Sequence, residues 1–395
     1  MVALTPIPHP VRTRITAAAL LLAPLAACSE GSDGAVADTG PDLPASVAVT
    51  PGGTSARAGV PVTVTATGGT LSAVTVADAE GRTLAGKPSA DGRTWTSVRK
   101  AAPGASYTVT AVTTTASGSR ATSRSTFTTA PPGKVNTVDW RPGAGATVGV
   151  AQPISLVFDH PVTDKAAVER QLRVTTSDGT EGSWGWIEDW SGRDRVDWRP
   201  AAYWKPGTEV TVKAELNGTD SGDGGWFVRD YTTRFTVGAR QIVTVDLDAK
   251  RLTLTRDGGA VRTIPVSGGT PGGDKRSWRG TSVLMAREGT ITMNSETVGL
   301  GDAYDKLVDS SMRLTWSGMY AHAAPWNDRW MGRANRSSGC IGMRDADAAW
   351  LYAQVRPGDP FEITGRDTKG VPAPGNGFGA WNLSFDQWRA KSALR

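Results

Sequence analysis

Short runs of alternating polar and apolar residues, separated by glycine and proline, recur along most of this 395-residue chain. Examples lie at 62–66, 107–112, 209–214 and 242–246. Successive side chains of a strand point to opposite faces, so this pattern is typical of strands with one face in a core. With 47 glycines and 24 prolines to supply turns, it predicts a mainly β protein of several domains.

The turn signals divide the chain. Residues 46–131 and 134–238 each have the length and strand pattern of an immunoglobulin-like sandwich, with Pro131-Pro132-Gly133 between them. A β-rich domain follows at 240–366, and its one convincing helix is predicted at 345–355, while a shorter helix capped by Asp164 is expected in the second sandwich. We expect the last segment, 367–395, to pack on the other domains because it is rich in aromatic residues (Phe378, Trp381, Phe385 and Trp388).

The N-terminus has the plan of an export signal. Arg12 and Arg14 precede a short apolar stretch that ends in Leu25-Ala26-Ala27-Cys28. This ending resembles a bacterial lipobox, in which the signal (1–27) is removed and the cysteine is lipidated; residues 28–45 would then be a flexible tether. A plain secretory signal is the alternative. In both cases we expect the protein to act outside the cytoplasm. With the lipid, it would be anchored to the outer face of the cytoplasmic membrane.

Composition narrows the possible partners. The net charge of +5 and the pI near 9.3 favour approach to an anionic surface or polymer, but no run of Lys and Arg is present, which argues against nucleic acid. The loop at 268–273 is rich in glycine but lacks Gly-Lys-Ser/Thr, so the sequence gives only weak support for a phosphate-binding loop. Five tryptophans of the second sandwich could line a glycan groove, although core packing is favoured: Trp184, Trp186, Trp190, Trp204 and Trp226.

The chemistry centres on one thiol and one imidazole. Cys340 is the only cysteine after Cys28, and His322 is the only histidine after His160. A cysteine attacks a carbonyl as its thiolate. An imidazole within reach can produce the thiolate, either as a general base that takes the thiol proton or as the cationic half of an ion pair. Gly339 permits a tight turn before the nucleophile, and amides there could form an oxyanion hole. An inert buried cysteine and an unrelated loop histidine are the alternative.

The residues around this pair resemble a known family. The stretches His322-Ala323-Ala324-Pro325-Trp326 and Ser337-Ser338-Gly339-Cys340-Ile341-Gly342-Met343 resemble the motif of the L,D-transpeptidases, which make 3→3 cross-links in peptidoglycan. The resemblance implies a β-rich catalytic domain behind two sandwich domains. Many relatives carry His at the position of Ser338, and members often carry Arg or Asn at the position of Gly342.

The resemblance also implies roles. Cys340 would be the nucleophile and His322 the base, the carbonyl of Ala323 would orient the imidazole, and amides near Gly339 would stabilise the oxyanion. Met293 and Trp316 would line the donor pocket. Further substrate contacts are expected from Ser337, Ser338, Tyr320, Trp326 and Arg344. No metal or cofactor is implied, and we expect a monomer.

The implied donor is a peptidoglycan stem tetrapeptide whose third residue is a diamino acid. Cys340 would attack the carbonyl of that residue and expel the terminal D-Ala, and a second stem would then accept the acyl group from the thioester. Two alternatives stay open from the residues alone. Water could be the acceptor, which gives an L,D-carboxypeptidase, or the chain could be a non-catalytic lipoprotein that binds the cell wall.

Overall fold

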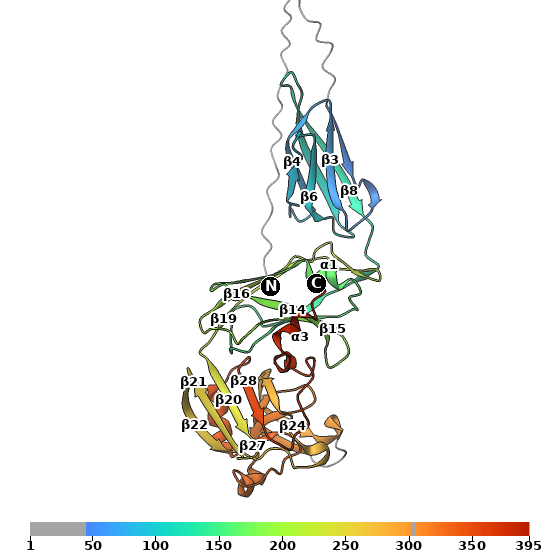
Figure 1. The fold of residues 1–395 in the computed structure, drawn as a ribbon. Helices are drawn as coiled ribbons and strands as arrows, with labels where there is room; N and C mark the ends of the chain where they lie inside the picture. The colour runs from blue at the N-terminus through green and yellow to red at the C-terminus, as the bar shows by residue number, and fades with distance from the viewer. Residues whose placement is uncertain (1–44, 300, 302–304, 395) are drawn as a thin grey trace, which may run out of the picture. The chain divides into compact units, whose positions relative to one another are not determined.

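The computed structural model describes residues 45–299, 301 and 305–394. The predicted signal, Cys28 and all but the last residue of the tether lie outside the described residues. The described chain forms six four- or five-stranded sheets and one small three-stranded sheet, whereas its helices are few and short, so the mainly β fold class is confirmed (Figure 1). No helix among the described residues is long and apolar enough to cross a membrane.

The first two sheets enclose one core. One has the order β1-β3-β6-β5 and the other β2-β8-β7-β4. The strands are β1 (Ser46–Thr50), β2 (Gly53–Ala56), β3 (Pro61–Thr67), β4 (Thr70–Asp78), β5 (Gly86–Pro88), β6 (Thr94–Lys100), β7 (Ser106–Thr114) and β8 (Arg120–Thr129). Every second residue of β3 is buried, as the alternation predicts, and the ring of Tyr107 stacks on Phe127 at 5.1 Å in the core.

The next two large sheets have the orders β10-β12-β15-β14 and β11-β19-β16-β13. Their strands are β10 (Val138–Arg141), β11 (Ala146–Val148), β12 (Ile154–Phe158), β13 (Leu172–Thr176), β14 (Gly182–Glu188), β15 (Asp194–Pro200), β16 (Glu209–Ala214) and β19 (Tyr231–Val237). The small sheet joins β9 (Lys134–Val135), β17 (Asp220–Gly222) and β18 (Gly225–Trp226). Helix α1 (Lys165–Glu169) begins at the predicted cap, where the Asp164 carboxylate accepts the N–H of Ala167.

The tryptophans of this part mostly fill its core. Trp184, Trp186 and Trp204 are buried among the apolar side chains of both sheets, and Trp226 is half-buried. Trp190 is the exception, with 59% of its surface exposed. The preference for core packing over a glycan groove is therefore confirmed for three of the five, because stacked sheets need large side chains to fill the space between them.

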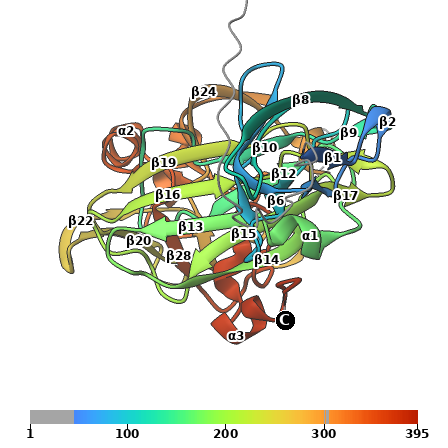
Figure 2. The ribbon, with the colours of Figure 1, turned by 90° about the horizontal axis from the view of Figure 1, so that it is seen from above.

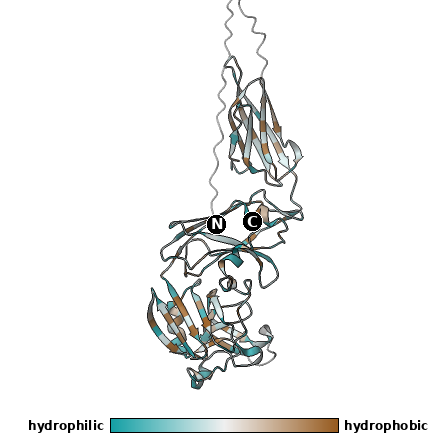
Figure 3. Ribbon diagram, in the orientation of Figure 1, coloured by the Kyte–Doolittle hydropathy of each residue, from teal (hydrophilic) through white to brown (hydrophobic). Residues whose placement is uncertain are grey.

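Two sheets of the third β region (residues 241–364) position the thiol and the imidazole. The five-stranded sheet has the order β22-β21-β20-β28-β23 and the four-stranded sheet β24-β25-β26-β27. The first contains β20 (Gln241–Asp246), β21 (Arg251–Arg256), β22 (Gly259–Pro265), β23 (Gly280–Val283) and β28 (Pro360–Thr364). The second contains β24 (Ala286–Asn294), β25 (Asp305–Arg313), β26 (Tyr320–Ala323) and β27 (Ile341–Met343). Apolar and polar residues alternate along many of these strands (Figure 3).

Three short 3₁₀ helices and one α-helix complete this region. They are η1 (Gly273–Lys275), η2 (Ser295–Val298), η3 (Pro325–Trp330) and α2 (Asp345–Gln354). Helix α2 is the one predicted after Cys340, and it buries Ala348 and Leu351 against the core of the two sheets. The alternation of apolar and polar residues at 312–316 also predicts a strand, and this prediction is wrong at its C-terminal end. β25 stops at Arg313 because the chain turns there, with the N–H groups of Leu314 and Thr315 donating to the carbonyl of Met319.

The C-terminal segment forms a 3₁₀ helix, η4 (Gly379–Asn382), and an α-helix, α3 (Phe385–Arg389). Helix α3 was not predicted from the sequence. Figures 1 and 2 both draw α3 beside β14, and the indole N–H of Trp388 donates to the carbonyl of Ser183 in that strand at 3.0 Å. Ser384 and Gln387 form a capping box at its start. That Ser-x-x-Gln spacing was a local signal for the helix.

Candidate active site

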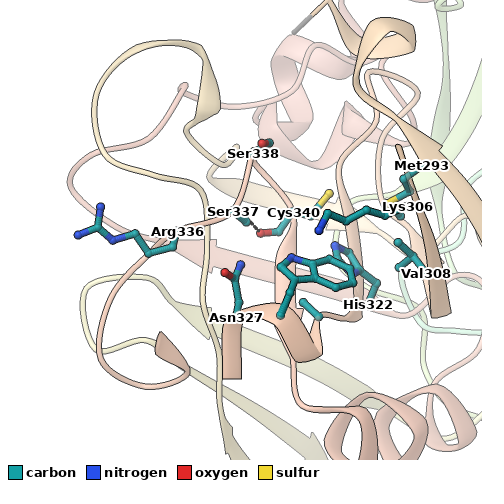
Figure 4. A pocket seen from close by; sticks show the side chains of 11 residues that line it. Met293, Lys306, Val308, His322, Asn327, Arg336, Ser337, Ser338 and Cys340 are labelled. Carbon is teal, nitrogen blue, oxygen red and sulfur yellow. Dashed lines mark hydrogen bonds between the residues drawn. The ribbon is translucent and has the colours of Figure 1, made fainter. Parts of the chain in front are cut away.

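A pocket of about 180 Å³ lies against the four-stranded sheet of the third region (Figure 4). Its wall is built from β24, β25, β26, η3 and the turn before β27, all of which contribute side chains. His322 and Cys340 both line it, so the structure brings the thiol and the imidazole to one cavity. The remaining lining side chains are Met293, Lys306, Val308, Ala324, Trp326, Asn327, Arg336, Ser337 and Ser338.

The pairing of β26 with β27 explains why the two groups meet. These strands run parallel, with Ala321 opposite Ile341 and His322 opposite Gly342. Cys340 directly precedes β27 and therefore lies at the end of the pair where β26 begins. A parallel pair needs a long connection, which here contains η3 and the turn that leads to Cys340.

The imidazole of His322 is buried and held in one orientation. Its Nδ1 lies 2.6 Å from the carbonyl oxygen of Ala323. A carbonyl can only accept, so Nδ1 must carry the hydrogen and Nε2 is left with a lone pair. Burial lowers the pKa of His322 below its usual value, and the Ala323 carbonyl offsets part of that effect. The ring is consequently neutral near pH 7, with its basic nitrogen at Nε2.

The thiol of Cys340 is also buried, with 8% of the residue exposed. Burial raises its pKa to about 11, and the backbone N–H of Tyr320 and the charge of Lys369 act in the opposite direction. The Sγ atom lies 3.5 Å from the carbonyl oxygen of Gly318, which accepts from the thiol. Cys340 is therefore a protonated thiol in this state.

Two serines brace the turn that carries Cys340. The hydroxyl of Ser337 donates to the Cys340 carbonyl at 2.6 Å and accepts the N–H of Gly339 at 3.1 Å. Buried Ser277 donates to the Gly339 carbonyl at 2.8 Å. Gly339 has a φ of +122°, a conformation that side-chain-bearing residues rarely adopt. Because its N–H is already bound to Ser337, Gly339 would have to release this bond before it could donate to an oxyanion.

The C-terminal segment supports the other side of Cys340. The side chain of Asn376 accepts the N–H of Ser317 and donates to the Ser317 hydroxyl, both at 2.9 Å. Ser317 directly precedes Gly318, whose carbonyl accepts from the Cys340 thiol. The Asn376 residue is buried, with 3% of its surface exposed. The turn before β26 is thus held by a residue distant in the chain.

The other residues predicted to touch substrate divide into two groups. Met293, Trp326, Ser337 and Ser338 line the pocket together with Cys340 and His322. Trp316, Tyr320 and Arg344 do not line it.

The turn after β25 explains the position of Trp316. The guanidinium groups of Arg141 and Arg313 lie 5.6 and 5.5 Å from the centre of its ring. The hydroxyl of Tyr320 on β26 donates instead to the carboxylate of Glu288 on β24, two strands away in the same sheet, at 3.0 Å. Arg344 is exposed at the start of α2.

Several residues near the site were not predicted from the sequence, among them Ser277, Lys306 and Asn376. Ser277 and Asn376 contact the turns around Cys340, and Lys306 lines the pocket from β25. None of the three sits in a motif, and a loop (Ser277), strand pairing (Lys306) and packing of the C-terminal segment (Asn376) bring them to the site. Among the described residues, no group of three or more His, Cys, Asp or Glu side chains is arranged to hold a metal ion.

Comparisons with known proteins agree with this architecture. A model of the L,D-transpeptidase catalytic domain matches residues 240–363, and a model of a bacterial Ig domain matches residues 53–220. The immunoglobulin-like sandwich class and the β-rich catalytic domain predicted from the sequence are therefore confirmed. The match to residues 240–363 contains the whole pocket.

Individual relatives carry names from the same family. L,D-transpeptidase 2 of Mycobacterium tuberculosis is 34% identical over 317 residues, which are 78% of this chain and 75% of that protein. L,D-transpeptidase 1 of the same species is 36% identical over 228 residues, which are 57% of this chain and 83% of that protein. The solved structure of LD transpeptidase LdtMt1 in complex with imipenem covers 59% of this chain and 99% of its own, at 35% identity and a TM-score of 0.49. On the strength of the first relative, the chain belongs to the L,D-transpeptidase family.

Proposed function

We propose that this protein is a cysteine L,D-transpeptidase that forms 3→3 cross-links in peptidoglycan through a thioester on Cys340. The observation that carries the proposal is the orientation of His322. Its Nδ1 is bound to the Ala323 carbonyl at 2.6 Å, which leaves Nε2 as the basic nitrogen in a pocket that also contains the Cys340 thiol. A basic nitrogen in the same pocket as a thiol supports the pairing of a nucleophile with a general base.

The first half of the reaction forms the acyl-enzyme. His322 takes the proton of the Cys340 thiol while sulfur attacks the carbonyl carbon of the third residue of a tetrapeptide stem. The bond from that carbon to the nitrogen of the terminal D-Ala breaks, and the imidazolium returns the proton to the departing amine. In the second half, the side-chain amine of another stem attacks the thioester. His322 accepts the amine proton and returns it to sulfur, so the thiol is regenerated.

The two pKa directions support general-base catalysis over a resting ion pair. Burial raises the pKa of Cys340 to about 11 and lowers that of His322. With the imidazole less basic than the thiolate, the neutral pair dominates at neutral pH. Proton transfer from the thiol therefore accompanies its attack on the carbonyl.

The oxyanion donors are proposed to be backbone amides at the turn that contains Cys340. In the described state the Gly339 N–H is bound to Ser337. Binding of a carbonyl oxygen would compete with this bond, and the Ser337 hydroxyl would keep its own bond to the Cys340 carbonyl, at 2.6 Å. This assigns Ser337 a positioning role in addition to its place in the pocket wall.

A direct experiment distinguishes this proposal from its alternatives. Purified protein is incubated with tetrapeptide stems, and the products are identified by mass. Cross-linked dimers with released D-Ala support the transpeptidase, whereas tripeptide alone supports the L,D-carboxypeptidase. Imipenem, the ligand in the related solved structure, serves as a probe. A covalent adduct on the wild type that Cys340→Ala cannot form supports the acyl-enzyme, and absence of both adduct and D-Ala release supports a non-catalytic wall-binding protein.

We also propose that the protein acts outside the cytoplasm, anchored by a lipid on Cys28. The support is the sequence Leu25-Ala26-Ala27-Cys28 after a short apolar stretch. The test is the mass and location of the mature chain in a bacterial host. Lipidation predicts a membrane-bound chain that begins at a modified Cys28, and Cys28→Ser should leave the precursor unprocessed. A soluble wild-type chain without added mass would indicate the plain secretory signal.

A further inference from the structure

The pocket around Cys340 carries an excess of positive charge. Among the described residues that line it, Lys306 and Arg336 are cationic, and none is an aspartate or glutamate. Cys340 is protonated and His322 neutral near pH 7, for the reasons given above. The two basic side chains thus set the charge of the cavity before a substrate enters.

Lys306 is the cation directed into the cavity. Figure 4 shows its side chain crossing the pocket from β25 toward Cys340 and His322, whereas Arg336 points away from them. The Lys306 ammonium lies 4.6 Å from the centre of the Trp326 ring, and that ring lies 6.1 Å from the imidazole of His322. The guanidinium of Arg336 instead packs on Trp330, at 5.2 Å from the ring centre.

Lys306 has no carboxylate partner within the part of the chain that the structure describes. Other cations of the same region do: Arg313 binds Glu288 at 2.6 Å, and Arg262 is paired with Asp347. The face of Trp326 attracts the ammonium and holds it in place, but a neutral ring cannot neutralise its charge. An ammonium held in this way is available to bind an anion that enters the pocket.

We propose that Lys306 binds a carboxylate of the donor stem and makes the enzyme select donors that carry it. The inference rests on the proposed function, since it names the substrate group that Lys306 recognises during the same reaction. Two carboxylates lie close to the scissile amide of a stem peptide: one on the side chain of a third residue such as diaminopimelate, and one on the terminal D-Ala. Both have the same chemistry, and the substrates of the test separate them.

The test uses three synthetic tetrapeptides. The first contains diaminopimelate with its side-chain carboxylate free, the second has that group as a primary amide, and the third keeps it free but ends in D-alaninamide. Release of the terminal residue is measured as kcat/KM for the wild type, Lys306→Gln and Lys306→Arg. Arg251→Gln is the matched control, because Arg251 is an exposed cation of the same region that does not line the pocket.

The wild type should prefer the free carboxylate over the corresponding amide by roughly two- to fivefold, the range of an exposed ion pair. Lys306→Gln should abolish that preference, while Lys306→Arg and Arg251→Gln should retain it. The preference should also weaken as salt is raised, since screening weakens an exposed pair. A preference against the second peptide assigns the side-chain carboxylate, and one against the third assigns the terminal carboxylate.

Two results would overturn the inference. In one, Lys306→Gln leaves both preferences unchanged; in the other, it lowers kcat/KM for all three peptides by the same factor. Either result leaves the transpeptidase proposal intact, because the donors are still consumed. Failure of the wild type to release a terminal residue from any of the three peptides would instead contradict the proposed function itself.

Discussion

The Nδ1 atom of His322 lies 2.6 Å from the carbonyl oxygen of Ala323, the next residue in the same strand. The orienting partner of the proposed base is thus a backbone group and not a carboxylate. A carbonyl fixes the tautomer but adds no full negative charge, so it raises the basicity of the ring only modestly. Burial therefore dominates, and the pKa of His322 is lowered.

The first prediction concerns the pH dependence of acylation. Since the pKa of His322 is lowered, kcat/KM for the donor should fall only below pH ~6.5, where a histidine ordinarily gains its proton. In His322→Gln, acylation should be slower by roughly 10²–10⁴-fold. Alkylation of Cys340 by iodoacetamide in that variant should rise with pH toward its pKa of about 11. Rapid alkylation of the wild type at pH 5 would instead indicate a thiolate–imidazolium pair and contradict this view.

The second prediction concerns the contribution of the C-terminal segment to the site. Asn376→Ala removes both side-chain bonds to Ser317 and should slow acylation by about tenfold, because the Gly318 carbonyl beside the thiol loses its support. Asn382→Ala is the matched control. Asn382 binds both backbone groups of Thr281, at 2.8 and 2.9 Å, and does not contact the turn before β26. Each variant should lose about 1–3 kcal/mol of unfolding free energy. Equal acylation rates in the two variants would show that Asn376 has only a structural role.

The third prediction concerns a buried ion pair on β15. Arg195 binds Asp197 through two bonds of 2.7 and 2.5 Å, and it also donates to the Gly377 carbonyl. Both side chains are almost completely buried. Asp197→Asn leaves a buried guanidinium without its counter-charge and should cost about 3–5 kcal/mol, measured by urea unfolding. The double variant Arg195→Met with Asp197→Leu should cost less than that single change. A larger loss in the double variant would mean that the bond to Gly377 matters more than the charge.

The fourth prediction concerns Asp359, whose side chain is completely buried. Burial raises its pKa from 3.8 to about 7, although the N–H of Arg356 acts in the opposite direction. One carboxylate oxygen, Oδ1, has no hydrogen-bond partner. The folded state therefore prefers the protonated form. Between pH 4 and 7 it binds a proton that the unfolded chain has lost, so this residue makes stability fall as pH rises.

Asp359→Asn should remove that contribution. The amide can keep the bonds from Gln241 and Arg356 at one atom while placing no charge in the core. The wild type should lose on the order of 4 kcal/mol between pH 4 and 8 that the variant does not lose. Thermal unfolding of both proteins across this range, compared as a difference, measures the effect. Parallel curves would show that Asp359 is ionised at neutral pH in the folded protein.

Local sequence patterns predicted much of the fold. Alternation predicted the strands, Asp164 predicted the start of α1, and the residues after Cys340 predicted α2. These signals work because the faces of a strand and the ends of a helix depend on residues a few positions apart. The prediction at 312–316 failed because the alternation of apolar and polar residues continues past Arg313 into a turn, and Trp316 does not line the pocket.

The sequence by itself determined the proposed reacting pair, since one cysteine and one histidine stood in a motif within a β-rich domain. Only the tertiary structure decided what surrounds them. Lys306 lines the pocket because β25 pairs with β26. Asn376 supports the turn before β26 because the C-terminal segment returns to that turn. Strand pairing and packing of the C-terminal segment bring together residues that are far apart in the chain. They depend on strand register and on the shape of the packed surfaces, which no local sequence pattern specifies.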